Sequence, residues 1–462
     1  MKGSEKIKHL YWRAGFGLTP REWETRRHWT VERAVDELFD HASQASALQL
    51  DGLTENRSVE ELKKLRGKKL DQAKNEGKLQ IVELNNGWIK RMVDSRESAL
   101  LERLCLFWHG HFACELKTPK PALAHLNMLR QHALGNFRDF VKAVARDVAM
   151  IRYLNNQQNR KSRPNENFAR ELLELFTIGR GNYTEKDIKE VARAFTGWSS
   201  DARGEYVFRS RQHDYGVKTV FDQSGKFDGD EIVDLILRQK ATARFVCYKV
   251  YRYFVNERVE ERIVEELAED FYASDYDLAR LFRRVFTSDW FYAPANVGTK
   301  IKSPIDLMVG MMRSLDVQFG NPKSISFAQR ILGQVLFRPP NVAGWPRGKN
   351  WIDNATLLLR LNLAESLYNE AEVSFQVKDL KATSASRRLR KMEARTDFQP
   401  LVDLYGRGTE TEIFTALKDY FLVGSAAIQA QQLAPYVLHD RTENYLKSVT
   451  LRLLSLPEYQ LC

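Results

Sequence analysis

Apolar residues recur at helical spacing along most of this chain. Between residues 96 and 107, Leu100 and Leu104 fall on one helical face, because positions three and four apart are neighbours on a helix. The same spacing returns at residues 245–254 and 279–286. No run of about eighteen consecutive apolar residues occurs, so the sequence predicts no membrane-spanning helix.

Alternation of apolar and polar positions, which is typical of strands, is scarce. The best candidates are residues 205–210 and 217–221, which flank His213 and are expected to pair as a hairpin. The predicted fold class is therefore mainly α. We expect a large single helical domain with long loops and at most a small β-hairpin near residues 205–221.

The chain contains no linker rich in Pro, Gly or Ser that would divide it into separate units. Residues 1–462 are therefore expected to form one mainly helical domain. Two segments differ from the rest in composition, because charged residues dominate near 55–80 and near 377–395. We expect both to be surface insertions.

Residues 159–198 carry signals for two helices with unusually many polar groups. The first helix is expected to open at residues 164–166, where a proline and an acidic residue suit an N-terminus, and to stop at Gly179. The second is expected to begin at residues 184–187, which resemble a capping box, and to close at Gly197.

Polar side chains on the first of these helices are candidates for chemistry. Asn167, Glu171 and Glu174 share one face, which could bind a hard cation or act in acid–base catalysis. In the alternative interpretation this face is simply solvated, and Arg170 pairs with Glu166 and Glu174 at i, i+4 spacing. The basic run before the helix brings cations to a helix N-terminus, which itself favours anions.

Two histidines lie close together in the string Trp-His-Gly-His-Phe. His109 and His111 point to opposite sides of a helix but to the same side of an extended segment. They can therefore act together only where Gly110 breaks the helix. Neutral imidazole is a good transition-metal ligand, whereas the alternative is a pair of packed histidines that satisfy backbone groups in the core.

A third candidate is the loop that contains His213 and Asp214. It combines an imidazole, a carboxylate, the flexible Gly216 and the cation of Lys218. Adjacent side chains rarely form a catalytic dyad with each other, so their catalytic partners are expected from elsewhere in the fold.

Composition limits the classes of function. Lys and Arg total 71 against 60 Asp and Glu, and the net charge of +11 favours anionic partners. The cations are spread along the sequence without a nucleic-acid-binding motif, so nucleic acid is a disfavoured partner. The four cysteines form no CxxC pair, which argues against a structural zinc site and a disulfide framework. The N-terminus lacks the apolar core of a signal peptide, so a cytoplasmic location is expected.

Several unusual strings occur in a fixed order and carry a resemblance to a known family. They are HLYWRAGFGLTPREW, LFWHGHFA, ALGNFRDFVKAVARDVAMIRYLNN, NRKSRPNENFARELLELFTIGRGNYTEKDI, HDYGVKTVF and LFRPPNVAGWPRGKNWIDNATLLLR. From His9 to about Gln460 the chain resembles the bacterial domain-of-unknown-function family 1800. The resemblance implies no established activity and assigns no catalytic residue. It implies a partner protein similar to sulfatases or alkaline phosphatases, and an exported setting for many relatives.

These residues favour an enzyme that acts on an anionic substrate, a small molecule or a glycan, by hydrolysis or group transfer with optional metal assistance. The candidate catalytic residues are His109, His111, Glu166, Glu171, His213 and Asp214. The candidate substrate-binding residues are Arg160, Arg163, Asn165, Asn167, Arg170 and Lys218. The sequence identifies neither a metal nor a cofactor.

Two other functions are consistent with the same residues. A non-catalytic helical scaffold would bind an acidic partner or an anionic polymer through its basic excess and through exposed aromatic residues such as Trp345 and Trp351. Nucleic-acid binding is the third hypothesis, and it rests on charge alone.

Overall fold

Helices make up most of the described residues in the computed structural model. The structure describes residues 2–49, 66–201, 203–369, 372–373, 390–391, 393–424 and 427–462. The helices of the first third are α1 (Gly3–Arg13), α2 (Pro20–Arg26), α3 (Val31–Ser43), α5 (Gly67–Val93), α6 (Ala99–His111), α7 (Pro119–His132), α8 (Phe137–Arg146) and α9 (Val148–Tyr153). The mainly α fold class is confirmed.

The remaining helices come from the middle and the last third of the chain. The middle of the chain forms α10 (Asn167–Glu171), a π-helical turn (Leu172–Thr177), α11 (Glu185–Ala194), α12 (Gly229–Leu237), α13 (Lys240–Phe254), α14 (Glu261–Ala273) and α15 (Leu278–Thr287). The last third forms α16 (Pro304–Ser314), α17 (Pro322–Leu332), α18 (Asn354–Leu361), α19 (Leu363–Tyr368), α20 (Gln399–Tyr405), α21 (Glu410–Phe421), α22 (Ala430–Leu433) and α23 (Thr442–Leu454).

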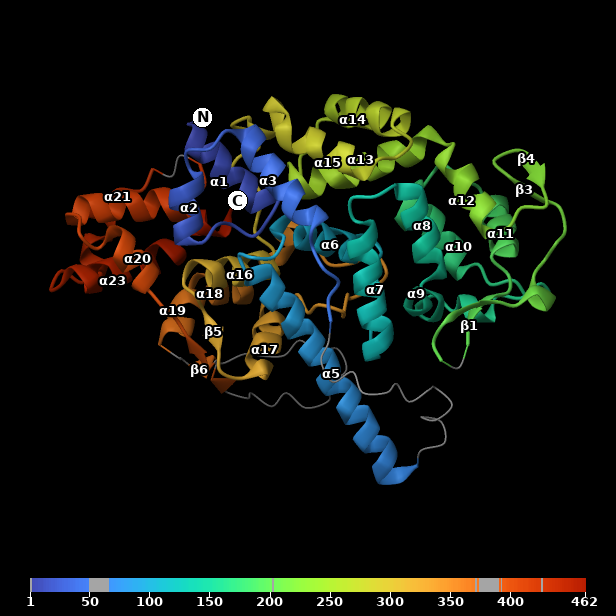
Figure 1. Ribbon diagram of the computed structural model, residues 1–462, viewed down its shortest axis with the longest axis horizontal. Helices are drawn as coiled ribbons and strands as arrows, with labels where there is room; N and C mark the ends of the chain where they lie inside the picture. The colour runs from blue at the N-terminus through green and yellow to red at the C-terminus, as the bar shows by residue number, and fades with distance from the viewer. Residues whose placement is uncertain are drawn as a thin grey trace.

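Figure 1 shows how these helices are arranged. Helices α1 to α3 and α19 to α23 lie together toward one end, although they come from opposite ends of the sequence. Helices α8 to α12 form the other end, and α6 lies between the two. Buried aromatic and aliphatic side chains from both ends belong to one hydrophobic core cluster.

The strands near residues 205–221 pair differently from the expected hairpin. The strands are β1 (Trp198–Ser200), β2 (Tyr206–Phe208), β3 (Lys218–Val220), β4 (Gln223–Gly225), β5 (Gln318–Phe319), β6 (Glu372–Val373), β7 (Arg390–Lys391) and β8 (Ala394–Arg395). Strands β2 and β3 occur where strands were expected, but β2 pairs with β1 and β3 pairs with β4, both antiparallel. The reason is a tight turn after β3, in which Phe221 and Asp222 both have positive φ, as a type I′ hairpin turn requires.

The two charged segments lie partly outside the described residues. Of the segment near 55–80, residues from Gly67 onward form the exposed first half of α5, which projects from the body of the molecule (Figure 1). Of the segment near 377–395, residues 377–389 and 392 lie outside the described residues. Its end includes β7 and β8, and β8 pairs with β5.

The predicted helical pair forms, with one unexpected feature. The second helix begins at a capping box between Thr184 and Asp187, as predicted. The first runs into a π-helical turn before Gly179, which has a φ of +79°. A π turn adds a residue to one helical turn, so the expected pairing of Arg170 with Glu174 is wrong: Glu174 pairs with Arg180 instead.

A buried ion pair lies at the centre of the fold. Arg103 of α6 and Asp306 of α16 form a salt bridge with side chains that are each 1% exposed. Arg103 also donates to the backbone oxygens of Trp12 and Gly15 and to the hydroxyl of Tyr253. The pair therefore joins four helices, α1, α6, α13 and α16, and the loop after α1.

We predict that Asp306→Asn lowers the free energy of unfolding by about 3–5 kcal/mol, because it leaves the Arg103 guanidinium buried without its counter-charge. Urea unfolding at pH 7 measures the change. The matched control is Asp94→Asn, which removes a surface pair with Arg96 and is expected to cost about 1 kcal/mol or less. Equal losses in the two variants would contradict a structural role for the buried pair.

Candidate functional site

A pocket with cationic and aromatic walls lies beside the central ion pair. It is formed by α6, α13, the start of α16 and the segment from Trp345 to Trp351, and it encloses about 50 Å³. Three cations line it: Arg252 from α13, Lys300 from the segment before α16, and Arg347. All three side chains are half-buried.

Aromatic rings line the same pocket. Tyr253 and Trp345 are partly buried, and Trp351 is 7% exposed. The ammonium of Lys300 lies 4.2 Å from the centroid of the Tyr253 ring, which is a cation–π contact. The expectation that Trp351 is exposed is therefore wrong, because its side chain packs into the pocket wall.

The charges around the pocket do not balance. Two carboxylates line it, but Asp306 is already paired with Arg103, and Glu257 is exposed. Burial alone would raise the pKa of Asp306, yet Arg103 and Lys300 lower it to about 2. The pocket therefore presents an excess of positive charge at neutral pH.

The lysine of the pocket titrates near physiological pH. Burial, assisted by Arg103, lowers the pKa of Lys300 to about 8 against the opposing effect of Asp306. Burial also lowers the pKa of Arg347. Perturbed groups of this kind gather at functional sites more often than elsewhere, because a site that holds charge away from water shifts the pKa.

Close backbone packing sets the shape of the pocket. Gly344 has a φ of +87°, and a Cβ atom there would lie 2.4 Å from the carbonyl oxygen of Gly110. Gly348 has a φ of +55°, and a Cβ there would lie 1.9 Å from a carboxylate oxygen of Glu257. Both positions favour glycine, so the segment between them is held tightly against α6 and the loop after α13.

His109 and His111 lie on either side of the pocket residue Gly110, and both are buried. His109 accepts a hydrogen bond at Nε2 from the backbone N–H of Phe337 (3.1 Å), and His111 Nε2 donates to the carbonyl oxygen of Phe176 (2.9 Å). Burial lowers the pKa of both imidazoles well below the usual range. Both side chains therefore fasten backbone segments together behind the pocket.

Another cation lies close behind His111. Lys249 of α13 donates from Nζ to the carbonyl oxygen of Leu175 (2.7 Å). Burial lowers the pKa of Lys249 to about 7, and Arg347 contributes in the same direction. Lys249 therefore fastens α13 to the π-helical turn behind the pocket and is close enough to Arg347 for the two cations to repel each other.

The His213 loop lies elsewhere, beside β3. His213 is 3% exposed, and its Nδ1 donates to the carbonyl oxygen of Thr196 (2.9 Å). Asp214 pairs with Arg193 (2.7 Å), and Arg193 holds the pKa of that carboxyl below its usual value. Lys218 is buried and donates to the backbone oxygens of Asp214 (2.6 Å) and Gly216 (3.1 Å). These groups are thereby engaged in contacts within the loop and with the C-terminal end of α11.

The remaining predicted residues lie on α10 and the turn before it. Arg170 pairs with Glu185 (2.8 Å) and, more weakly, with Glu166 (3.4 Å). Burial and the neighbouring Glu174 raise the pKa of Glu171.

Asn165 accepts a hydrogen bond from the backbone N–H of the exposed Asn167 (3.0 Å). Arg160 and Arg163 are exposed and line a surface hollow together with Asn165.

The three predicted motifs lie in different surroundings. The ring of His109 packs on Trp88, Phe337 and Trp345, that of His111 on Phe107, Trp108 and Phe112, and that of His213 on Phe208 and Tyr215. Among the residues that the structure describes, no three His, Cys, Asp or Glu side chains are arranged to hold a metal ion.

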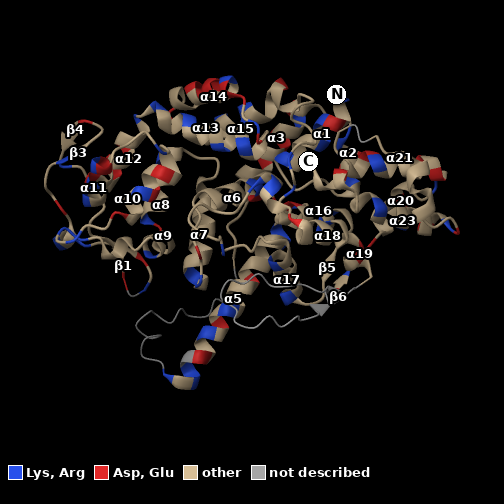
Figure 2. Ribbon diagram, turned by 180° about the vertical axis from the view of Figure 1, so that it is seen from behind, with Lys and Arg blue, Asp and Glu red and all other residues tan. Residues whose placement is uncertain are grey.

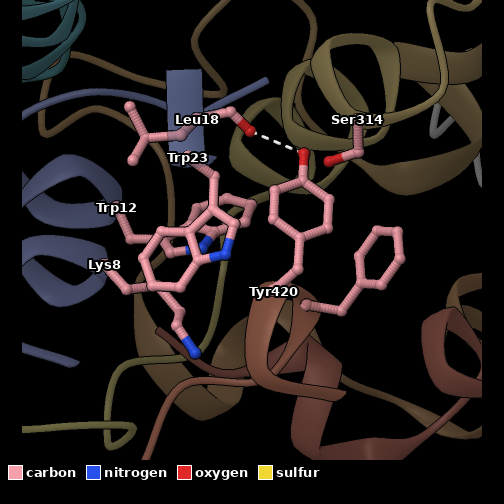
Figure 3. A pocket seen from close by; sticks show the side chains of 7 residues that line it. Lys8, Trp12, Leu18, Trp23, Ser314 and Tyr420 are labelled. Atoms are coloured by element: carbon pink, nitrogen blue, oxygen red, sulfur yellow. Dashed lines mark hydrogen bonds between the residues drawn. The ribbon is translucent and has the colours of Figure 1, made fainter. Parts of the chain in front are cut away.

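A second cavity lies between α1, α2 and α21 (Figure 3). Its walls include Lys8, Trp23 and Tyr420, and the Tyr420 hydroxyl donates to the carbonyl oxygen of Leu18 (2.7 Å). Its volume is about 10 Å³, which is space for a single water molecule. This cavity is too small for a substrate.

The cations of the pocket come from three separate stretches of sequence, which explains why local patterns do not single them out. Arg252 lies within an ordinary amphipathic helix, and Lys300 lies in a loop before α16. The one available signal is the Gly-Trp-Pro-Arg-Gly sequence at residues 344–348, where two glycines flank a cation and a large aromatic residue.

These features define a mainly helical protein with one cation-lined, aromatic-walled pocket near its centre. Residues 9–461 match the model of the family described as "Protein of unknown function (DUF1800)", and the chain belongs to that family. No curated protein and no solved structure matches the chain. In the described part of the chain, no helix has the length and apolar character needed to cross a membrane.

We predict that His109→Gln reduces the loss of stability in acid. Because burial lowers the folded-state pKa of His109, the unfolded chain binds the proton first, and stability falls as the pH drops below about 6.5. Glutamine retains an acceptor for the N–H of Phe337 but does not titrate. Urea unfolding at pH 7.5 and 5.5 compares the two proteins.

The comparison variant is His109→Ala, which leaves that N–H unpaired beside a new cavity and is expected to cost about 2–4 kcal/mol at both pH values. If wild type and His109→Gln lose the same stability on acidification, His109 does not titrate as a buried neutral imidazole.

Proposed function

We propose that this protein binds an oxyanion, the sulfate, phosphate or carboxylate group of a ligand, in the pocket lined by Arg252, Lys300 and Arg347. The observation that carries the proposal is the convergence of three half-buried cations, while the one buried carboxylate among them, Asp306, is already paired. Cations held away from bulk water attract an anion more strongly than surface cations do.

The size of the pocket supports a small charged group. A volume of about 50 Å³ corresponds to a few water-sized positions, which suits one tetrahedral or planar oxyanion and leaves the rest of the ligand outside. Arg347 and Arg252 offer guanidinium groups, whose planar donors match such oxygens in pairs. Trp345, which is partly buried, and Pro346, which is exposed, also line the pocket and offer apolar surface to the remainder of the ligand.

In the enzymatic form of the proposal, the protein catalyses hydrolysis or group transfer on this anionic substrate. Lys300 is the best candidate for general base, because a pKa of about 8 leaves part of the amine neutral at physiological pH. The arginines would hold the oxyanion and offset negative charge that develops during the reaction. His109 and His111 would then be positioning residues that hold Gly110 in the pocket wall.

A partner similar to sulfatases or alkaline phosphatases fits the same chemistry. Such a partner would release or consume the class of oxyanion for which the pocket is suited. We propose that the two proteins act on related anionic substrates. We also propose that this protein is located in the cytoplasm.

We predict that Arg347→Met and Lys300→Met each weaken sulfate or phosphate binding by about tenfold or more, because each removes a charge-assisted contact in a poorly hydrated site. Isothermal titration with each anion at low ionic strength measures the affinity. Lys349→Met is the matched control, since Lys349 is exposed two residues away and does not line the pocket. Unchanged affinity in both pocket variants would refute the site.

The affinity for the anion is also expected to fall as the pH rises through about 8. Lys300 is charged below its pKa and neutral above it, so the pocket loses one positive charge in that interval. Lys300→Arg should keep the affinity constant over the same range, because arginine stays protonated. Titrations between pH 7 and pH 9 test this; a wild-type affinity that does not change with pH would remove Lys300 from the site.

A further inference from the structure

Two loops form one continuous surface at the end of the molecule beside β1. Residues 158–165 and 208–217 are joined by the hydrogen bond from Lys161 N to the carbonyl oxygen of Gln212 (2.8 Å). Gly197 completes the junction, because its N–H donates to Asn159 and its carbonyl oxygen accepts from Arg209 N. We call this surface the basic end.

Unpaired cations dominate the basic end. Arg160, Lys161, Arg163, Arg209 and Arg211 are all exposed, and Figure 2 shows Lys and Arg gathered in the loops beside β1. Within the described residues, none of these five forms a salt bridge with a carboxylate. The nearby acids have other partners, since Asp214 pairs with Arg193 and Glu166 with Arg170.

Apolar side chains project from the same surface. Phe208, Tyr215 and Val217 are 46%, 59% and 58% exposed, and they are three of the nine large hydrophobic side chains exposed in the described residues. The rings of Phe208 and Tyr215 both pack on His213, with centroids 5.2 and 4.6 Å away. Buried His213 thus supports two aromatic rings that face outward.

A polar hollow lies between the cations. Its volume is about 410 Å³, and its walls are Gln158, Arg160, Ser162, Arg163, Pro164 and Asn165. The backbones of Arg160 and Arg163 pair in a tight turn, and both residues line the hollow. This volume and these donors suit a phosphate headgroup.

Internal contacts hold the basic end in shape. Arg193 fixes Asp214, and the buried Lys218 binds two backbone oxygens of the same loop. The side chain of Asn159 donates to the carbonyl oxygen of Ala192 (2.8 Å) and so anchors the first loop to α11. The exposed side chains are therefore presented by a fixed scaffold, which lowers the entropic cost of binding.

We propose that the basic end docks the protein on the surface of an anionic phospholipid bilayer. Cations would pair with lipid phosphates, and Phe208, Tyr215 and Val217 would enter the headgroup region, where aromatic and aliphatic side chains are both favoured. A single-stranded nucleic acid would use the cations and the two aromatic rings, but it offers nothing to the exposed Val217. This inference is independent of the anion pocket.

Vesicle sedimentation tests the proposal with the full chain. Vesicles of phosphatidylcholine containing about 30% phosphatidylglycerol should bind the protein at low salt, whereas pure phosphatidylcholine vesicles should not. Replacing Arg160, Arg163, Arg209 and Arg211 with glutamine should lower partitioning by roughly fivefold per charge, the equivalent of about 1 kcal/mol each. The double variant Phe208→Ser/Tyr215→Ser should also weaken binding.

The matched control removes the same charge elsewhere. Arg21, Arg258, Arg330 and Arg407 are exposed and lie outside the basic end, so their replacement by glutamine should leave binding within about twofold of wild type. Circular dichroism and thermal unfolding verify that each variant is folded.

Insertion of the basic end into the bilayer is measured with a fluorophore attached to the cysteine of a Phe208→Cys variant. The four native cysteines are buried, so an introduced surface cysteine is labelled selectively. Emission of an environment-sensitive dye at 208 should rise on anionic vesicles, whereas the same dye at Tyr436→Cys, an exposed position in the short 3-10 helix after α22, should not respond.

Three results would overturn the proposal. One is no binding to the anionic vesicles at low salt, and another is equal binding by the basic-end variant and its charge-matched control. The third is tight binding of a single-stranded oligonucleotide to the wild type, lost in the basic-end variant, while vesicles remain unbound. That result would assign the surface to nucleic acid.

Discussion

The buried guanidinium of Arg103 needs several acceptors at once, because a charge without partners is strongly destabilising in a protein interior. It finds them in Trp12 and Gly15, near the N-terminus, and in Asp306, in the last third of the sequence. Arg13, also buried, donates to backbone oxygens at the end of α13 and to that of Cys462. Segments separated by hundreds of residues are therefore fixed at one point, and the helices pack outward from it.

The pocket follows from that requirement. Arg103 already forms a salt bridge with Asp306. The ammonium of Lys300 makes a cation–π contact with the Tyr253 ring. The two glycines that hold the 344–348 segment against α6 and Glu257 then bring Arg347 into the same space. The excess of positive charge near the centre is thus a consequence of the Arg103–Asp306 pair and of the close packing of the 344–348 segment.

Local patterns predicted the elements better than they predicted the site. Helical spacing, the capping box at Thr184 and the stop at Gly179 concern residues close in sequence, and the structure contains all of them. The strand pairing and the π turn depend on backbone geometry that the side-chain pattern does not encode. The pocket depends on long-range packing of Arg252, Lys300 and Arg347, and no single stretch of sequence carries that information.

The π-helical turn at residues 172–177 also changes the direction in which successive residues of one helix face. The residues before it keep their charged side chains toward solvent beside Glu185, while the carbonyl oxygens of Leu175 and Phe176 face the interior. Those two oxygens accept hydrogen bonds from Lys249 and His111, behind the pocket. One extra residue in a helical turn thereby lets a single helix present charged side chains to solvent before the turn and backbone carbonyl oxygens to the protein interior within it.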